Sequence, residues 1–515
     1  MYHFDWINRH AERTPGKLAL VDAHSGRQFT YAQFNERANR FASFLRDTLG
    51  IQPGDRVSIL AQNSSDYYEV LFACGKMGAI LNTLNWRLAV PELEFILNDC
   101  EPRVLVYELT FAETVGELRS HIDCDFYVVM GEEAPGGEWT YEGAVATGAP
   151  QGVEMPSLQY SDTWAILYTS GTTGQPKGAQ VTYGSFFYNA VGMGRAIDLT
   201  SKDVNLKVLP TFHAGGLGLY AGPIFHAGGT LVVMRAFEPG EFLRLIEEWK
   251  VTVLLLVPSI YLILAQYPDF DEYDLSSIRH WGSGGSSLPP SLVHQYAEKG
   301  IIIQQGFGMT ETGPTVFIIT EKDALRKAGS VGKPVLHTDV CIMDRDHNLL
   351  GPNEVGELCI RGGNVITGYW NRPEATAKAI VAHPATGAGG PWLHSGDAAM
   401  YDDEGFYYIV DRWKDMFISG GENVYPAEVE NVIYHHPAVA EVAVIGVPHP
   451  KWQEVGRALV VVKEGQTVTE EELVEFCRGK LARYKIPKSV VLVDALPRTA
   501  AGKVLKRELR KEYGE

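Results

Sequence analysis

The segment Val251–Val257 constrains the fold more than any other, because it is apolar apart from Thr252 and ends at Pro258. A run of this kind is typical of a parallel strand that helices cover on both faces. Thr30 and Gln33 have the spacing of a capping box, which predicts the start of a helix. Further strands are predicted at 57–60, 103–107, 278–281 and 301–304, and helices at 67–77 and 290–299. This alternation predicts an α/β fold with a parallel sheet between helices.

The pattern changes after residue 330. Short β segments at 338–344, 356–361 and 405–410 are separated by Gly, Asn and Asp turns, which predicts a β subdomain over about 330–411. From 413 onward we expect helices at 427–435 and 470–483, and strands at 439–447, 456–462 and 489–493. The sequence therefore predicts a large N-terminal domain over 1–411 and a small α+β C-terminal domain over 412–515.

The charge of the chain argues against one class of partner. The 515 residues carry a net charge of −18, whereas phosphate contacts to nucleic acid require an excess of Lys and Arg. Residues 478–511 differ from the rest, with 11 basic side chains against Asp494 and Glu508. This basic stretch suggests a substrate or partner that carries phosphates, and the alternative is a solvated helix face. We expect no nucleic-acid binding.

We expect neither a signal peptide nor a membrane span. The first residues lack the apolar stretch of a signal peptide, and no run approaches the roughly 18 apolar residues of a membrane span. Six cysteines are present, and none lies in a CxxC pair or has metal-ligand spacing. Reduced cysteines in a cytoplasmic protein are the expected state.

A glycine- and threonine-rich string, Tyr168–Gly178, is the first chemical signal. It follows a short apolar strand at 164–167 and reads YTSGTTGQPKG. Small residues let backbone N–H groups approach phosphate oxygens, and the hydroxyls and Lys177 add further donors. The string is not a Walker A loop, because Lys177 follows Pro176 and precedes Gly178 instead of standing in a Gly-Lys-Ser/Thr sequence. A phosphate-binding loop is predicted.

A second glycine motif has a different interpretation. Gly216–Ala221 matches GxGxxA, but a dinucleotide fingerprint follows a strand and opens a βαβ unit. Here Pro210 and His213 stand just before it. We interpret the motif as helix packing or as part of an acyl pocket.

The phosphate loop and four other motifs, in the same order along the chain, resemble those of the adenylate-forming superfamily. That superfamily includes acyl-CoA synthetases, peptide-synthetase adenylation domains and luciferases. The other motifs are GFGMTETG at 306–313, GELCIRG at 356–362, HSGD at 394–397 with Asp411 and Arg412, and PRTAAGK at 497–503. The strings YWNRPEAT at 369–376 and ISGGENVYP at 418–426 are most similar to those of bacterial fatty-acid–CoA ligases.

The resemblance implies a two-step ligase that joins a carboxylic acid to ATP and passes the acyl group from acyl-AMP to CoA. It implies Lys503, Thr310, Glu311 and His213 as catalytic residues, with Glu311 holding Mg²⁺. Phe307 would stack on adenine, where the family usually has Tyr. The implied ATP and AMP contacts are Thr169, Ser170, Gly171, Thr172, Thr173, Gly174, Lys177, Gly285, Ser286, Gln305, Gly306, Phe307, Thr310, Asp397, Arg412 and Lys503.

For the second step, the resemblance implies that the C-terminal domain rotates about a hinge at Lys414. Gly420 and Gly421 would then line the tunnel for CoA. Many plant coumarate ligases and luciferases have Lys where Gly420 stands, so this position favours the bacterial fatty-acid branch. A peripheral membrane contact and a homodimer are left open.

The acyl pocket is the least constrained part of the prediction. Its expected lining is Phe212, His213, Gly215, Gly216, Trp281, Gly282, Gly308 and Met309, where glycines leave room for an acyl group. We expect a medium- or long-chain fatty acid first and an aromatic acid second. A peptide-synthetase-type enzyme would need an Asp in the pocket, no feature of the sequence requires a luciferase-like oxygenase, and a non-catalytic nucleotide-binding module would not need Lys503, Glu311 and Thr310.

Overall fold

The computed structural model describes residues 4–169, 176–383, 390–413, 415–419, 422–498 and 504–514. The chain divides into two compact units. The first comprises residues 1–339, 360–382 and 389–393, and the second comprises 340–359, 383–388 and 394–515. The domain boundary expected between 411 and 412 thus falls inside the second unit.

The first unit contains a seven-stranded sheet with the strand order β7-β6-β5-β3-β4-β8-β9. All neighbours are parallel except β8 and β9, which form an antiparallel pair. The strands are β3 (Arg56–Leu60), β4 (Ile80–Thr83), β5 (Val104–Glu108), β6 (Phe126–Met130), β7 (Trp139–Thr140), β8 (Thr163–Thr169) and β9 (Lys177–Thr182). The predicted strands at 57–60 and 103–107 are confirmed as β3 and β5.

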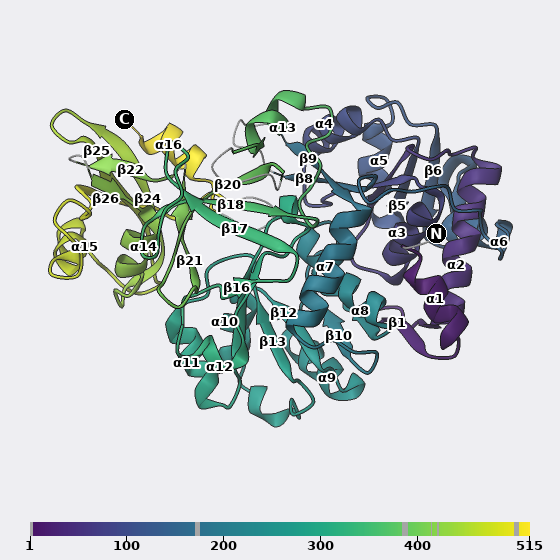
Figure 1. Ribbon diagram of the computed structural model, residues 1–515, viewed down its shortest axis with the longest axis horizontal. Coiled ribbons are helices and arrows are strands. Elements are labelled where there is room, and N and C mark those ends of the chain that lie inside the picture. Colours follow the sequence, from purple (N-terminus) through teal and green to yellow (C-terminus); the bar gives the residue numbers. More distant parts are fainter. Residues whose placement is uncertain are drawn as a thin grey trace. The chain divides into compact units, whose positions relative to one another are not determined.

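A nine-stranded sheet of the first unit follows the order β16-β15-β14-β13-β12-β10-β11-β1-β2 (Figure 1). Its members are β1 (Leu18–Asp22), β2 (Gln28–Thr30), β10 (Val204–Lys207), β11 (Thr230–Val233), β12 (Val253–Leu256), β13 (His280–Ser283), β14 (Ile303–Phe307), β15 (Phe317–Ile318) and β16 (Lys333–Pro334). The run Val251–Val257 that predicted a parallel strand contains β12, which pairs in parallel with β10 and β13.

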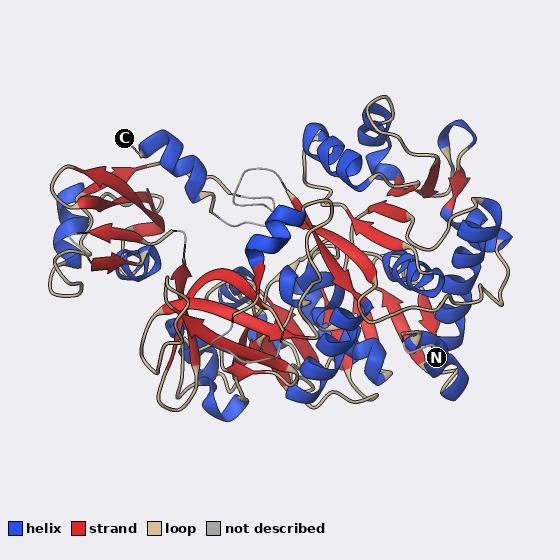
Figure 2. Cartoon of the chain, turned by 45° about the horizontal axis from the view of Figure 1, so that its top comes forward, coloured by secondary structure: helices blue, strands red, loops and turns tan. Residues whose placement is uncertain are grey.

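Helices of the first unit flank the strands of both sheets (Figure 2). They are α1 (Trp6–Arg13), α2 (Tyr31–Ser43), α3 (Ser65–Met77), α4 (Val90–Cys100), α5 (Ala112–Leu118), α6 (Tyr141–Thr147), α7 (Tyr183–Ala196), α8 (Ala221–Ala227), α9 (Pro239–Trp249), α10 (Pro258–Ala265), α11 (Pro290–Glu298), α12 (Glu321–Ala324) and α13 (Pro373–Ala379). Helix α2 begins with the predicted capping box, in which Thr30 accepts from the Gln33 amide and Gln33 accepts from the Thr30 amide.

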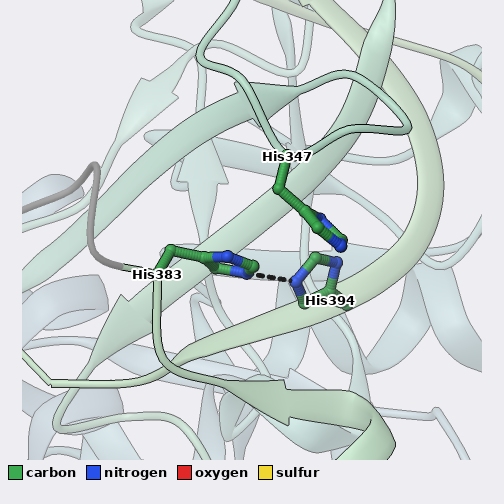
Figure 3. Close-up of side chains that lie close together, drawn as sticks. All are labelled: His347, His383 and His394. Atoms are coloured by element: carbon green, nitrogen blue, oxygen red, sulfur yellow. Dashed lines mark hydrogen bonds between the residues drawn. The ribbon is translucent and has the colours of Figure 1, made fainter.

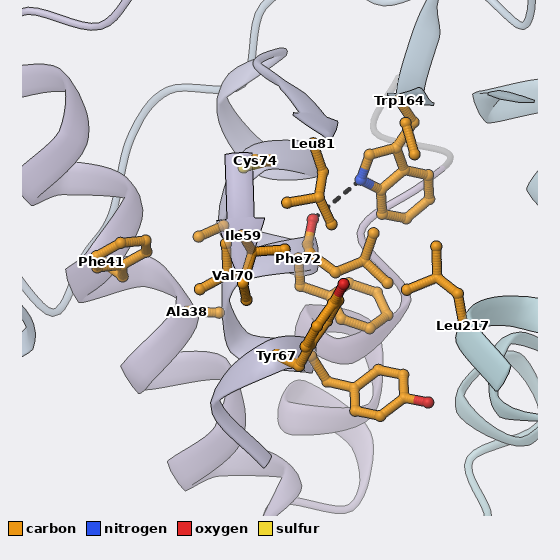
Figure 4. Packing of buried hydrophobic residues seen from close by; sticks show 14 of the residues in the cluster. Ala38, Phe41, Ile59, Tyr67, Val70, Phe72, Cys74, Leu81, Trp164 and Leu217 are labelled. Carbon is orange, nitrogen blue, oxygen red and sulfur yellow. Dashed lines mark hydrogen bonds between the residues drawn. The ribbon is translucent and has the colours of Figure 1, made fainter. Parts of the chain in front are cut away.

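One hydrophobic core joins the two sheets of the first unit. It takes side chains from β1 and β11 of one sheet, from β3, β4 and β8 of the other, and from α2, α3, α7 and α8. Helix α3 is buried from Tyr67 to Met77, as expected of a helix with apolar layers on both sides. Near the middle of α3, the Leu71 carbonyl accepts a hydrogen bond from the Trp164 indole of β8 at 2.9 Å, and this indole packs on Phe72 (Figure 4).

Residues 338–412 form a five-stranded sheet with the order β17-β18-β20-β19, in which β21 pairs with β20. The strands are β17 (Thr338–Met343), β18 (Gly356–Gly362), β19 (Ile380–Val381), β20 (Trp392–Tyr401) and β21 (Tyr407–Arg412). These strands confirm the β segments that the Gly, Asn and Asp turns predicted.

The C-terminal part of the second unit holds another five-stranded sheet, β23-β22-β25-β24 with β26 on β25. Its elements are β22 (Phe417–Ser419), β23 (Glu422–Val424), α14 (Pro426–Tyr434), β24 (Val439–His449), β25 (Gln453–Val462), α15 (Glu470–Cys477), β26 (Ser489–Leu492) and α16 (Lys506–Tyr513). The helix predicted over 470–483 was too long. It ends at Cys477, because Arg478 is already extended, with a ψ of 139°, and Gly479 follows with a φ of 74°.

The described helices include none that is both long and apolar enough to cross a lipid bilayer.

Candidate active site

The predicted phosphate loop joins the two antiparallel strands at the edge of the seven-stranded sheet. Thr169, the last residue of β8, stands opposite Lys177, the first residue of β9. Gly178 has no room for a side chain, because a Cβ there would lie 2.6 Å from the Ile166 side chain. The loop residues Ser170, Gly171, Thr172, Thr173 and Gly174 lie outside the described residues.

Three side chains form a row beside this hairpin. The Lys177 ammonium lies over the Tyr369 ring, 5.4 Å from its centroid, and the Tyr369 hydroxyl donates to Glu311 Oε1 at 2.9 Å. Burial and the neighbouring Glu311 carboxylate raise the pKa of Tyr369 above its ordinary value, so the hydroxyl stays a donor. A carboxylate and a lysine are thus held on either side of one ring, as a site for phosphate and a cation requires.

Glu311 stands in a tight turn at residues 308–315. Its relative exposure is 8%, and its backbone carbonyl accepts from the Ile366 amide. Asn364 fixes the turn, since its side-chain amide donates to the carbonyls of Thr312 at 2.9 Å and Thr315 at 2.8 Å. Gly308 is required by packing, because a Cβ there would meet the Pro314 carbonyl. The turn presents Thr310 half-buried beside Glu311.

The two residues that hold Glu311, Asn364 and Tyr369, were not predicted as site residues. They come from a segment more than 50 positions later in the sequence. Tyr369 is held against β9, because the Trp370 amide donates to the Gly178 carbonyl and the Gln180 amide donates to the Gly368 carbonyl. The string YWNRPEAT was a signal for this segment, but it did not say which residue reached Glu311.

The predicted adenine-side residues lie on or just beyond adjacent parallel strands. Gln305, Gly306 and Phe307 end β14, and Phe307 packs near Phe317 at a centroid distance of 6.1 Å. The Gln305 side-chain oxygen is buried and has no hydrogen-bond partner among the described atoms. Gly285 and Ser286 follow β13, where Gly285 adopts a φ of 85°. The carboxyl ends of parallel strands are the usual ligand edge of an α/β sheet.

Phe212 and His213 follow β10. Their rings lie 4.5 Å apart, and the Phe212 carbonyl accepts from the Thr83 hydroxyl at 3.0 Å. Phe212 is buried and lies near Trp86 and Arg87, whereas His213 is half-buried. The structure thus fixes this pair between the two sheets of the first unit.

The predicted ribose-side residues belong to the second unit. Asp397 on β20 is 4% exposed and pairs in register with Arg412 on β21. The Asp397 amide donates to the Ser395 hydroxyl at 3.0 Å across Gly396, which has a φ of 70° within β20. Lys414, Gly420, Gly421 and Lys503 lie outside the described residues.

The model of the AMP-binding enzyme family matches residues 7–370, and that of the AMP-binding enzyme C-terminal domain matches residues 428–503. The chain belongs to the AMP-binding enzyme family. A feruloyl-CoA synthase of Amycolatopsis is 40% identical over 99% of this chain and 98% of its own length. The long-chain-fatty-acid–CoA ligase FadD13 of Mycobacterium tuberculosis is 38% identical over 100% of this chain and 99% of its own length.

A solved structure of o-succinylbenzoate CoA synthetase from Bacillus subtilis, in complex with the acyl-adenylate intermediate OSB-AMP, is 32% identical to this chain. It has a TM-score of 0.86 and covers 98% of each chain. The adenylate-forming resemblance is therefore confirmed, and this AMP-binding enzyme is an AMP-forming, ATP-dependent acyl-CoA ligase.

In this AMP-binding enzyme, some of the predicted acyl-pocket residues serve packing. The Trp281 indole is 5% exposed and lies in the core with Tyr261, on the face of β13 opposite Gly282. The space that a side chain at Gly282 would need is filled by the Tyr220 hydroxyl, and that at Gly216 by the Pro210 carbonyl. Trp281 thus packs in the core on the far face of β13 from the acyl pocket that we propose.

A cavity of about 10 Å³, which has room for about one water, lies beside Gly215 and Gly216 and has a polar wall that sequence reasoning missed. Its lining includes Asn205 and Lys207 on β10, and Tyr220 after the turn. The buried Tyr220 hydroxyl hydrogen-bonds His280 Nε2 at 2.5 Å, and His280 Nδ1 lies 2.7 Å from the Gln304 side-chain oxygen. Burial lowers the pKa of His280 to about 4, so the imidazole is neutral at pH 7.

Lys207 is the unusual member of this wall. Its side chain is buried, contacts the Thr211 hydroxyl and lies over the Tyr68 ring. Among the described residues, no carboxylate pairs with it. Burial lowers the pKa of Lys207 well below its ordinary value. The signal in the sequence was a lysine at an inward position of a strand that is otherwise buried.

Proposed function

We propose that this ligase uses Lys177, Thr310 and Glu311 to hold ATP while an aromatic carboxylate attacks it. The observation that supports the proposal best is the row Lys177–Tyr369–Glu311 beside the loop between β8 and β9. It provides a cation and an acidic ligand at the place where the sequence predicts a phosphate loop.

The first step brings two anions together. A carboxylate oxygen bonds to the α-phosphorus as the bond from that phosphorus to the pyrophosphate oxygen breaks, giving acyl-AMP and pyrophosphate. The site must neutralise charge and orient both reactants, and a strong base is not needed. Lys177 and the Thr310 hydroxyl are proposed to contact phosphate oxygens, and Lys503 to bridge the carboxylate and the α-phosphate.

The residues around Glu311 fit a magnesium ion. Mg²⁺ prefers oxygen ligands and usually binds through one or two carboxylates together with substrate phosphates. One Glu311 oxygen accepts from Tyr369, which leaves the second oxygen for the ion. A bound Mg²⁺ would neutralise phosphate charge there.

The second step is proposed to use residues of the C-terminal region. The CoA sulfur bonds to the acyl carbon, AMP leaves and the thiol proton passes to water. Asp397 and Arg412 are proposed to hold the ribose, Lys414 to act as the hinge, and Gly420 and Gly421 to line the thiol path. These assignments rest on the family resemblance.

The polar wall supports an aromatic acid that carries a hydroxyl or methoxy group. Lys207 and Asn205 each have an N–H beyond the one they use within the protein and would be donors to such an oxygen, whereas the Tyr220 hydroxyl donates to His280 and would be an acceptor. An aliphatic tail offers no acceptor and would gain no hydrogen bond from this wall, whose groups already have partners within the protein. We therefore rank the aromatic acid above the fatty acid, reversing the order that the sequence suggested.

The substrate proposal is tested by pyrophosphate release over a panel of acids, each with and without CoA. We expect the highest kcat/KM for cinnamic or benzoic acids with a ring hydroxyl or methoxy group. In Lys207→Met, the preference for these acids over their unsubstituted analogues should fall at least about 10-fold. A wild-type preference for hexadecanoate would overturn the aromatic proposal and leave the ligase activity intact.

The roles of the acidic ligand and the distal lysine are tested separately. Glu311→Gln should slow pyrophosphate formation by about 10²- to 10³-fold, while Glu321→Gln on the exposed face of α12 should not. Lys503→Ala should block adenylation and still convert supplied acyl-AMP to acyl-CoA. Equal loss of both half-reactions in Lys503→Ala would contradict its proposed role.

The thiol path is tested by Gly421→Leu. An isobutyl group there should spare pyrophosphate release in a single turnover and reduce the yield of acyl-CoA. The melting temperature is the control for misfolding. Unchanged acyl-CoA synthesis would place the path elsewhere.

We further propose a cytoplasmic location for the enzyme. None of the six cysteines, all within the described residues, forms a disulfide, and this supports the proposed cytoplasmic location. A homodimer and a peripheral membrane contact stay predictions, which light scattering and vesicle flotation would test.

A further inference from the structure

Three histidines of the second unit converge outside the proposed active-site residues. His347, His383 and His394 come from separate segments, and one ligand atom from each lies within 4.8 Å of the other two. The rings face one another across a narrow gap, with His383 Nε2 and His394 Nε2 2.7 Å apart (Figure 3). The His347 ring centroid lies 4.8 Å from that of His383 and 5.4 Å from that of His394.

Two of these rings are held in place by neighbouring groups. His394 Nδ1 lies 2.7 Å from Glu357 Oε2, which leaves Nε2 directed at His383. The His347 backbone has a φ of 62°, in a turn where the Asp344 carboxylate accepts from the amides of Asp346 and Asn348. His and Asn are among the few residues that adopt this conformation readily. The turn directs an exposed imidazole toward a buried one.

We propose that His347, His383 and His394 bind a divalent transition-metal ion such as Zn²⁺, with a water as the fourth ligand. Three imidazoles with one open position are a known coordination set for zinc, and imidazole also suits Ni²⁺ and Cu²⁺. Mg²⁺ and Ca²⁺ prefer oxygen ligands, so the proposed site differs in chemistry from the magnesium site at Glu311.

The His383–His394 pair needs only a small adjustment to accept the ion, and the His347 ligand atom already lies within 4.8 Å of both. Zinc–nitrogen bonds of about 2.0–2.1 Å in a tetrahedron separate two ligand nitrogens by about 3.3 Å. The two Nε2 atoms, now 2.7 Å apart, would move apart by roughly 0.6 Å, which side-chain rotation provides. Glu357 supplies the carboxylate that commonly orients a metal-bound histidine.

The ion would also stabilise the strand that carries Asp397. Glu357 accepts from the Gly396 amide through its other oxygen at 3.0 Å, so one carboxylate joins His394 to the residue before Asp397. A metal ion on His394 Nε2 fixes Nδ1–H as a donor to Glu357. Metal binding should therefore raise the stability of the second unit, because a ligand that binds only the folded state adds to its free energy of unfolding.

The test uses the untagged full-length chain after removal of metal by EDTA. Zn²⁺ is titrated by calorimetry without ATP, and Co²⁺ by its visible absorption. We expect one equivalent of tightly bound metal and a higher melting temperature with Zn²⁺. His347→Asn keeps a residue that tolerates the turn and removes the imidazole, so its affinity should fall at least about 10-fold. His121→Asn, at an exposed histidine of the first unit, is the matched control and should bind as the wild type does.

Three results would overturn the proposal. The first is no saturable binding of either ion by the wild type. The second is an equal affinity in His347→Asn and His121→Asn, with both variants folded by circular dichroism before metal is added. The third is a thiolate charge-transfer band with Co²⁺ that Cys359→Ser abolishes, because the Cys359 sulfur lies 3.6 Å from His394 Nδ1 and would then be the ligand.

Discussion

The two faces of the nine-stranded sheet differ although they belong to the same strands. On one face, Leu206, Leu254 and Trp281 pack under α9, α10 and α11 in a dry core. On the other, the alternate positions of β10 and β13 carry Lys207 and His280, both buried and polar. The first face stabilises the fold, whereas the second carries groups whose desolvation opposes folding. Such groups fit the acyl-binding role proposed for this second face, which is called the binding face below, and the first is called the packing face.

The largest effect is expected from the packing face. Leu254→Ala should lower the free energy of unfolding by about 2–5 kcal/mol, because it leaves a cavity in a filled core. Its ratio of kcat/KM for two acids should match that of the wild type. A changed ratio would mean that the two faces are not independent.

The next largest effect is the loss of stability at low pH that we expect from His280 on the binding face. An unfolded His has a pKa near 6.5, whereas that of His280 is about 4 in the fold. Between these values the unfolded chain binds a proton that the folded chain rejects, so stability falls as pH falls from 6.5 to 4. The loss reaches about 3 kcal/mol.

Urea unfolding at several pH values checks this expectation. His280→Gln, which retains hydrogen-bonding groups, should remove this part of the pH dependence, and His121→Gln should leave it unchanged. If both variants keep the wild-type profile, His280 is not the group that titrates.

Replacing the buried Lys207 should increase the stability of the fold, in contrast to the two preceding changes. Lys207→Met should raise the free energy of unfolding at pH 7 by about 1–3 kcal/mol, because a desolvated amine is exchanged for a thioether of similar length. Thr211 keeps its bond to Asn63 in this variant. The gain should shrink toward pH 10.5, where the unfolded lysine also loses its proton. A less stable variant would mean that the amine has a compensating partner.

The smallest effect is expected for Tyr220→Phe. Loss of the hydroxyl bond to His280 should cost about 1 kcal/mol, measured by chemical unfolding. In the same variant, KM should rise for acids with a ring hydroxyl and stay constant for unsubstituted ones. A uniform rise would assign the hydroxyl to structure alone.

The sequence predicted the alternation of helices and strands well, because apolar runs and caps act locally. The capping box at Thr30 and the strand within Val251–Val257 are examples. The motif around Glu311 was also identified, because it is contiguous in sequence, but the turn that it forms was not predicted. Asn364 and Tyr369 were missed, since their role arises from contacts with residues far away in sequence, and no local pattern encodes such a contact.

The binding face was missed for a different reason. Periodicity gives the direction of a side chain on a strand, so Lys207 could have been recognised as an inward-facing lysine. The contacts of Lys207 depend on the segment 215–220, which places Tyr220 near the lysine. The histidine cluster could not be predicted either, because His347, His383 and His394 lack the short spacing of a metal motif.

The parallel pairing of β1 with β11 has a consequence for how the protein is made. Leu20 stands beside Leu231, 211 positions later, whereas β3 and β4 pair within about 25 residues of each other. At roughly 5–20 residues per second, a ribosome needs about 10–40 s to produce the partner of β1. During that interval the seven-stranded sheet can assemble, while β1 has its antiparallel neighbour β2 and lacks its parallel neighbour β11. The edge of β1 that pairs with β11 therefore stays open in the nascent chain until residues 230–233 have been translated.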